Sequence, residues 1–144
     1  MKKILIVEDD ARVASALKIR IEGAGYQTAL AEDAISAVSI AVSARPDLVL
    51  VDINMPAGNG FSAVEHIRAR LPGPLPVVFI TASKQPGLVE RAGAMGANGF
   101  IEKPYDPVSL LLLLQNLLEK PISQNFAPRS MPPPAPSRLT EMLR

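Results

Sequence analysis

The sequence of 144 residues contains no cysteine and no tryptophan, and its one histidine is His66. A chain without cysteine has neither disulfides nor thiolate metal ligands. His66 has no second histidine with which to bind a metal or move a proton. A metal ion bound by this chain must therefore be held by oxygen atoms. The lack of disulfides fits the cytoplasm, where we expect the protein to be.

Long apolar runs and an excess of one charge are also missing. No stretch approaches the roughly 20 apolar residues of a membrane span. Residues 1–3 lead into only four apolar residues, so we expect no signal peptide or anchor. Residues 1–120 hold 12 Lys and Arg against 13 Asp and Glu. Because a near-neutral domain lacks the positive surface that binds phosphate backbones, neither nucleic acid nor a membrane is the expected partner.

Short apolar, β-branched runs alternate along the chain with stretches of helical periodicity. The runs are too apolar to face water, and they predict buried parallel strands at residues 3–7, 27–31, 48–52, 76–80 and 98–102. Apolar residues three and four apart predict helices at residues 11–23, 34–45, 60–71, 84–96 and 107–119. Five strand–helix units predict an α/β fold, a doubly wound parallel sheet with helices on both faces.

Local signals also predict how these helices begin. Asp10, Asp33 and Asp106 each precede a helical stretch and are expected N-caps. The helix at 84–96 is expected to be short or mobile, because helix-breaking residues occupy four of its positions. These residues are Pro86, Gly87, Gly93 and Gly96.

Polar residues gather where the expected strands end. The carboxyl ends of parallel strands meet at one edge of the sheet, which is where such folds bind ligands. The residues expected there are Glu8, Asp9, Asp10, Asp52, Thr81 and Lys103. Converging carboxylates repel one another unless they share a cation, and oxygen ligands favour a hard ion such as Mg²⁺. A cation, a lysine and a hydroxyl beside Asp52 would offset the charge of a phosphoryl group, which indicates phosphoryl transfer.

Two simpler interpretations of the acids stay open at this point. Aspartate often closes a strand as a turn former, which would explain Asp52 alone. The acidic cluster after the first strand could equally be a solvated loop.

Four segments in register resemble the receiver domain of bacterial two-component response regulators. The resemblance covers about residues 2–120. It rests on the runs IVEDD ending at Asp10, VDINMP ending at Pro56 with Gly60 behind it, ITA ending at Ala82, and GFIEKP ending at Pro104. It implies a flavodoxin-like (βα)5 fold with strand order 2-1-3-4-5, and a cis peptide bond before Pro104.

The resemblance also implies a role for each acid. Asp52 would accept a phosphoryl group from a sensor histidine kinase or a phosphotransfer protein. Glu8, Asp9 and Asp52, with the backbone carbonyl of Asn54, would hold Mg²⁺. Asp10 is better explained as the cap of the first helix, because Glu8 and Asp9 directly follow the strand.

The remaining implied residues sense the phosphate. Thr81 and Lys103 would each bind an oxygen of the phosphoryl group on Asp52, and Thr81 and Phe100 would form a switch that changes a surface read by a downstream protein. The chain would then be a phosphoacceptor that supports its own phosphorylation and dephosphorylation, and not an enzyme acting on other substrates.

Two other functions remain as alternatives. The chain could be the N-terminal regulatory fragment of a DNA-binding transcriptional response regulator. It could also be a phosphatase-like hydrolase with Asp52 as nucleophile, which needs a second acid where this sequence has Asn54.

Composition divides the chain near residue 120. Six of the 24 residues in 121–144 are proline, so we expect a receiver domain at 1–120 and a flexible tail or linker at 121–144.

The last expected helix is unusually rich in leucine. A helical projection places Val108 and Leu112 opposite its sheet-facing stripe. That stripe is expected to hold Leu110, Leu111, Leu114 and Leu118. We expect an exposed apolar surface within residues 84–119 that binds a partner or a second copy. The alternative is that scattered surface leucines need no explanation.

Overall fold

The structure, a computed structural model, describes residues 1–55 and 59–119. Strands and helices alternate in the order β1 (Lys3–Val7), α1 (Ala11–Gly23), β2 (Gln27–Ala31), α2 (Ala34–Ala44), β3 (Leu48–Asp52), α3 (Gly60–Arg70), β4 (Val77–Thr81), α4 (Leu88–Ala94), β5 (Gly99–Glu102) and α5 (Pro107–Leu118). All neighbouring strands pair in parallel, in the order β2-β1-β3-β4-β5. This confirms the predicted fold. The predicted tail at 121–144, and Pro56 of one motif, lie outside the described residues.

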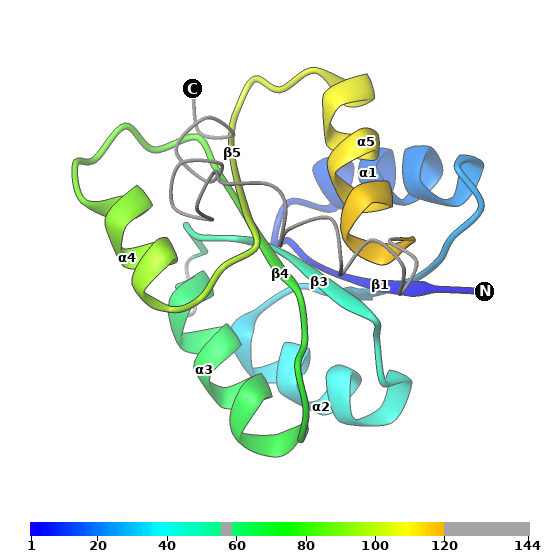
Figure 1. The fold of residues 1–144 in the computed structure, drawn as a ribbon, viewed down its shortest axis with the longest axis horizontal. Helices are drawn as coiled ribbons and strands as arrows, with labels where there is room; N and C mark the ends of the chain where they lie inside the picture. The colour runs from blue at the N-terminus through cyan, green and yellow to red at the C-terminus, as the bar shows by residue number, and fades with distance from the viewer. Residues whose placement is uncertain (56–58, 120–144) are drawn as a thin grey trace, which may run out of the picture.

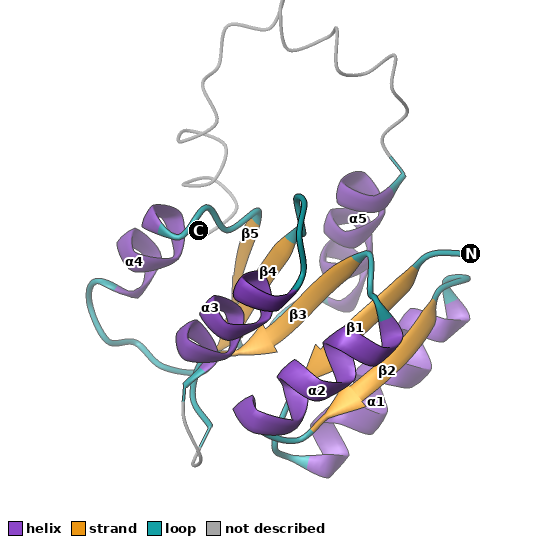
Figure 2. Cartoon of the chain, turned by 90° about the horizontal axis from the view of Figure 1, so that it is seen from below, coloured by secondary structure: helices purple, strands orange, loops and turns teal. Residues whose placement is uncertain are grey.

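The sheet is sandwiched between two layers of helices (Figures 1 and 2). One face packs against α1 and α5, and its buried side chains include Leu17, Ile21, Leu110 and Leu114. The other face packs against α2, α3 and α4, and its core includes Phe61, Phe79 and Phe100. Because both faces are covered, strands β1, β3 and β4 are almost fully buried, as their apolar sequences indicated. The prediction of a buried strand at 27–31 was wrong in part, because β2 lies at the edge of the sheet and is buried only at Ala31. Within the described residues, no helix is long and apolar enough to cross a membrane.

The predicted N-caps are present. The Asp10 carboxylate accepts hydrogen bonds from the N–H groups of Arg12 and Val13, and so begins α1. Asp33 and Asp106 cap α2 and α5 in the same way. Asp10 therefore serves the helix, as predicted.

Helix α4 is shorter than the predicted helix at 84–96, because it runs only from Leu88 to Ala94. Gly87, just before it, has a left-handed φ of 88° and offers no side chain to cap the first turn. Gly96 has a φ of 75° and ends the helical path on the other side. The left-handed conformations of Gly87 and Gly96 thus limit the helix at both ends.

Helix α5 has the two-sided character that its leucines predicted. Leu110, Leu114 and Leu118 are buried against the sheet, whereas Leu111, also predicted to be in this stripe, is only partly buried. Two further apolar side chains face outward, Val108 with 62% and Leu112 with 54% of its surface exposed.

Candidate functional site

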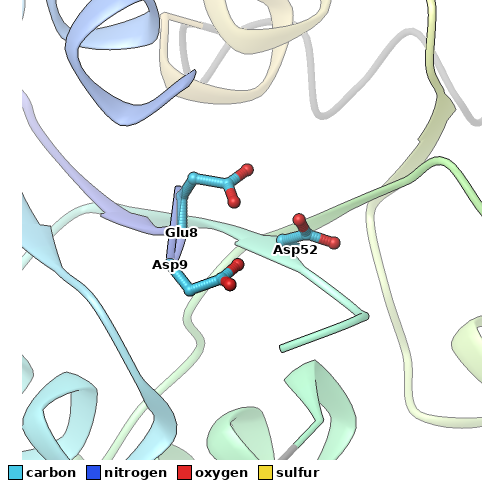
Figure 3. Close-up of side chains that lie close together, drawn as sticks. All are labelled: Glu8, Asp9 and Asp52. Carbon is cyan, nitrogen blue, oxygen red and sulfur yellow. The ribbon is translucent and has the colours of Figure 1, made fainter. Parts of the chain in front are cut away.

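The carboxyl ends of four strands bring the predicted site residues to one edge of the sheet. Asp52 is the last residue of β3 and Thr81 the last residue of β4. Glu8 and Asp9 directly follow β1, next to β3 in the sheet, and Lys103 directly follows β5. Residues up to 95 positions apart in sequence thus meet here, as Figure 3 shows for the three carboxylates.

Glu8, Asp9 and Asp52 form an acidic cluster. One carboxylate oxygen from each lies within 4.8 Å of the others. Glu8 and Asp52 are only 3% and 5% exposed, whereas Asp9 is open to solvent. Three carboxylates at this spacing are a donor set for a hard cation such as Mg²⁺, which prefers oxygen ligands and keeps several waters. The solvent-facing side at Asp9 leaves room for those waters.

Lys103 lies between the two buried acids. Its Nζ atom is 3.2 Å from Glu8 Oε1 and 3.2 Å from Asp52 Oδ2. Burial alone would lower the pKa of Lys103, but the negative charges of Asp52 and Glu8 outweigh it and raise that pKa. The ammonium group therefore stays charged. The Lys103–Pro104 peptide bond is cis, as the resemblance implied.

Burial in this arrangement disfavours the ionised form of the Glu8 carboxyl group. The pKa of Glu8 is raised from 4.5 to about 7, chiefly by burial and also by the nearby Asp52 charge. A hydrogen bond from the Asp10 N–H and the charge of Lys103 act in the opposite direction, without cancelling the effect of burial. Lys103 alone therefore does not compensate for the burial of Glu8.

We expect Glu8→Gln to stabilise the metal-free protein increasingly as the pH rises. The Glu8 carboxyl has a higher pKa in the folded protein than its ordinary value of 4.5, so folding favours its protonated form and wild type loses stability as the pH rises through about 7. Glutamine has no proton to lose. The advantage of the variant should grow by about 1 to 3 kcal/mol from about pH 5 to about pH 8. Thermal unfolding with excess chelator measures it, and an advantage independent of pH would contradict it.

Thr81 is fully buried and already has hydrogen-bond donors around it. Asn54 Nδ2 donates to Thr81 Oγ1 at 3.0 Å, and the Ser83 N–H donates to the same oxygen at 2.9 Å. The Asn54 N–H donates in turn to Asp52 Oδ1 at 3.0 Å. Asn54 therefore connects Asp52 to Thr81.

Sequence reasoning missed two members of this network. It assigned only the backbone carbonyl of Asn54, and it gave Ser83 no role. Their spacing, two residues after Asp52 and two after Thr81, is compatible with a turn at each strand end. It does not reveal that the Asn54 side chain reaches across to β4.

Phe100 lies in the core, beside the strand that carries Thr81. It is paired in register with Phe79 of β4 and is 1% exposed. The centroid of the Phe79 ring lies 4.9 Å from the centroid of the Phe61 ring, at the start of α3. The contact between these two rings links β4 to α3. Backbone pairing links β4 to Phe100 on β5.

Four similarities to known proteins bear on this site. The family model of the response regulator receiver domain matches residues 4–115. The DNA-binding response regulator MtrA of Mycobacterium tuberculosis is 34% identical over 119 residues, which are 83% of this chain and 51% of MtrA. The non-phosphorylated HemR receiver domain from Leptospira biflexa has a TM-score of 0.76 and 31% identity, and the match covers 84% of this chain and 97% of that domain.

A CheY-like response regulator receiver domain from Methanospirillum hungatei JF-1 is also similar, with a TM-score of 0.77 and 27% identity over 83% of this chain and 94% of that one. The similarity agrees with the predicted fold and resemblance. The chain spans about half the length of curated relatives such as MtrA.

Proposed function

Because this chain belongs to the family of response regulator receiver domains, we propose that it is a phospho-accepting signalling switch with Asp52 as its acceptor. The observation that carries the proposal is the position of Asp52, buried beside two further carboxylates and 3.2 Å from the Lys103 ammonium. Such a carboxylate faces a place where a bound cation and the Lys103 ammonium can together offset the charge of a phosphoryl group.

The proposed reaction moves a phosphoryl group from a phosphohistidine to Asp52. A carboxylate oxygen of Asp52 bonds to phosphorus while the bond from phosphorus to the histidine nitrogen breaks. The nitrogen keeps the electron pair of that bond and takes a proton from solvent. The product is an acyl phosphate on Asp52 and a free histidine on the donor, which we propose to be a cytoplasmic histidine kinase domain or a phosphotransfer protein.

Glu8, Asp9 and Asp52, with the Asn54 carbonyl, would hold Mg²⁺, which supplies positive charge to the phosphoryl oxygens. Lys103 would pair with one of those oxygens. Thr81 Oγ1 accepts hydrogen bonds from Asn54 and Ser83, so its own hydrogen is available to another oxygen.

The same contacts suggest how the switch works. Moving Thr81 toward the phosphoryl group would break its hydrogen bonds from Asn54 and Ser83 and loosen the loop that leads to α4. Phe100, paired with Phe79 on the neighbouring strand, would repack as Thr81 moves. A local charge would thus change a distant surface.

Incubation of the protein with acetyl phosphate and Mg²⁺ tests the proposal. We expect mass spectrometry of the intact protein to show one added phosphoryl group, and none when a chelator is in excess. Equal uptake with and without the chelator would contradict the metal requirement, and no uptake under any condition would contradict the switch.

A second candidate is the regulatory part of a longer transcriptional regulator. The observation that favours it is that relatives named as DNA-binding regulators match this chain over about half of their length. Both candidates use the same switch. Reading the coding sequence beyond codon 144 separates them, because only the second requires a DNA-binding domain there. We keep the division into a receiver domain at 1–120 and a tail at 121–144 as a proposal.

We also propose that the outer face of α5, centred on Val108 and Leu112, binds a second copy or a downstream partner when Asp52 is phosphorylated. Two large apolar side chains, each more than half exposed and one helical turn apart, form an apolar strip beside the Pro107 end of the helix. Burying such a strip is favourable.

Leu112→Glu should weaken this association at least about tenfold, because a carboxylate would have to be buried in the contact. Analytical ultracentrifugation with and without beryllofluoride, a phosphoryl mimic, measures it. Ile35→Glu is the matched control, since Ile35 is 79% exposed but lies on α2, on the other face of the sheet. A monomer in both states, with unchanged partner capture by Leu112→Glu, would contradict the proposal.

A further inference from the structure

Gly60 is the first residue of α3 and lies against the backbone of Asp52. A Cβ atom added to Gly60 would be 2.5 Å from the Asp52 carbonyl oxygen, 3.0 Å from Ile53 Cα and 3.1 Å from the Asp52 carbonyl carbon. All three are backbone atoms, so no side-chain rotation can relieve the overlap. The residue at this position must lack a side chain for the helix to approach so closely.

The requirement concerns space and not backbone conformation. Gly25, Gly73, Gly87 and Gly96 have positive φ values and no atom near an added Cβ, whereas Gly60 has the crowding without a positive φ. Gly23 has neither feature. Gly60 therefore differs from these four turn glycines.

Gly60 is also hydrogen-bonded to the residue that follows Asp52. Its N–H donates to the Ile53 carbonyl at 2.8 Å, and the Ile53 N–H donates to the Ile80 carbonyl of β4 at 3.0 Å. The N–H of the next residue, Asn54, donates a hydrogen bond to Asp52 Oδ1 at 3.0 Å. The backbone next to Asp52 is thus hydrogen-bonded both to the start of α3 and to β4.

We propose that Gly60 is a positioning residue, which places the Asp52 carboxylate and the Asn54 carbonyl by letting α3 rest directly on their backbone. The proposal rests on the proposed function, because it concerns the same site. A side chain at position 60 would push the Asp52 carbonyl away from the helix and shift both groups relative to Glu8 and Asp9. Displacements of about 1 Å at a reacting group can cost about 100-fold in rate.

The test compares Gly60→Ala with Gly23→Ala. Gly23 lies in the last turn of α1 with no atom within 4 Å of an added Cβ, so the same chemical change there meets nothing. Two constants are measured for each protein: the Kd for Mg²⁺ by NMR titration, and the rate of phosphorylation by acetyl phosphate at saturating Mg²⁺. We expect Gly60→Ala to weaken Mg²⁺ binding and to lower the saturated rate at least about tenfold each, and Gly23→Ala to match wild type.

A purely structural role makes a different prediction. Gly60→Ala would then melt at a lower temperature, but its folded fraction would bind Mg²⁺ and accept phosphate as wild type does, which would overturn the proposal. If the variant is unfolded in buffer, the measurements are made for all three proteins in trimethylamine N-oxide, which favours the compact state. Failure to fold even there would show that Gly60 serves the whole fold, and would overturn the proposal as well.

The outcomes also separate this proposal from the proposed function. If wild type binds Mg²⁺ but takes up no phosphoryl group, the proposed function is wrong and the Mg²⁺ constants still report on Gly60. If wild type is phosphorylated and Gly60→Ala behaves like Gly23→Ala, only the role of Gly60 is wrong. If wild type does neither, Gly60 has no site to position and both are wrong.

Discussion

Asp52→Asn is expected to take up no detectable phosphoryl group from acetyl phosphate, with or without Mg²⁺. Asparagine has nearly the same shape as aspartate, but its neutral amide is not a nucleophile for phosphorus. The fold should persist, since the change removes one of two negative charges beside Lys103 and leaves Glu8 as its partner at 3.2 Å. Intact-mass spectrometry measures the loss, and circular dichroism checks the fold.

Asp106→Asn is the matched control for this experiment. Asp106 caps α5 through its side chain, and asparagine caps a helix about equally well. The control should therefore fold and take up one phosphoryl group as wild type does. Undiminished labelling of Asp52→Asn would show that the acceptor lies elsewhere.

Asp9→Ala should weaken Mg²⁺ binding by a factor on the order of 100 while leaving the metal-free protein as stable as wild type, or slightly more stable. Asp9 supplies the exposed corner of the acidic cluster, so its loss removes a ligand without opening the core. Removing one of three neighbouring negative charges also relieves repulsion that is otherwise unbalanced without the metal. Isothermal titration calorimetry measures the affinity, and thermal unfolding with excess chelator measures the stability.

Asp10→Ala provides the opposite pattern at the next residue. Its carboxylate caps α1 through the N–H groups of Arg12 and Val13, so the variant should lose about 1 kcal/mol of stability and keep its Mg²⁺ affinity. If Asp9→Ala instead lowers the melting temperature strongly and Asp10→Ala loses the metal, the two acids have been assigned the wrong way round.

Much of the architecture was readable from local signals. Apolar β-branched runs such as 48–51 marked the buried strands, because only a sheet covered on both faces can hide them. Asp10, Asp33 and Asp106 marked helix starts, because a side-chain oxygen at the N-cap bonds to N–H groups two or three residues ahead. Since parallel strands share one carboxyl edge, the residues of the candidate site also followed from the order of the elements.

The extent of α4 was predicted less well. Its glycines and Pro86 predicted a short helix. Its boundaries at Leu88 and Ala94, however, depend on the left-handed conformations of Gly87 and Gly96. A glycine permits such a turn without requiring it.

The tertiary structure alone decided how the site residues touch. Lys103 pairs with both Glu8 and Asp52, the Asn54 side chain reaches Thr81, and Gly60 rests on the Asp52 backbone. Burial of Glu8 beside Asp52, which raises its pKa to about 7, is likewise a property of the packed sheet. The sequence determined which groups arrive at this edge, because strand ends are encoded locally. Their distances, charges and clearances depend on how strands and helices distant in sequence pack, and no local pattern carries that information.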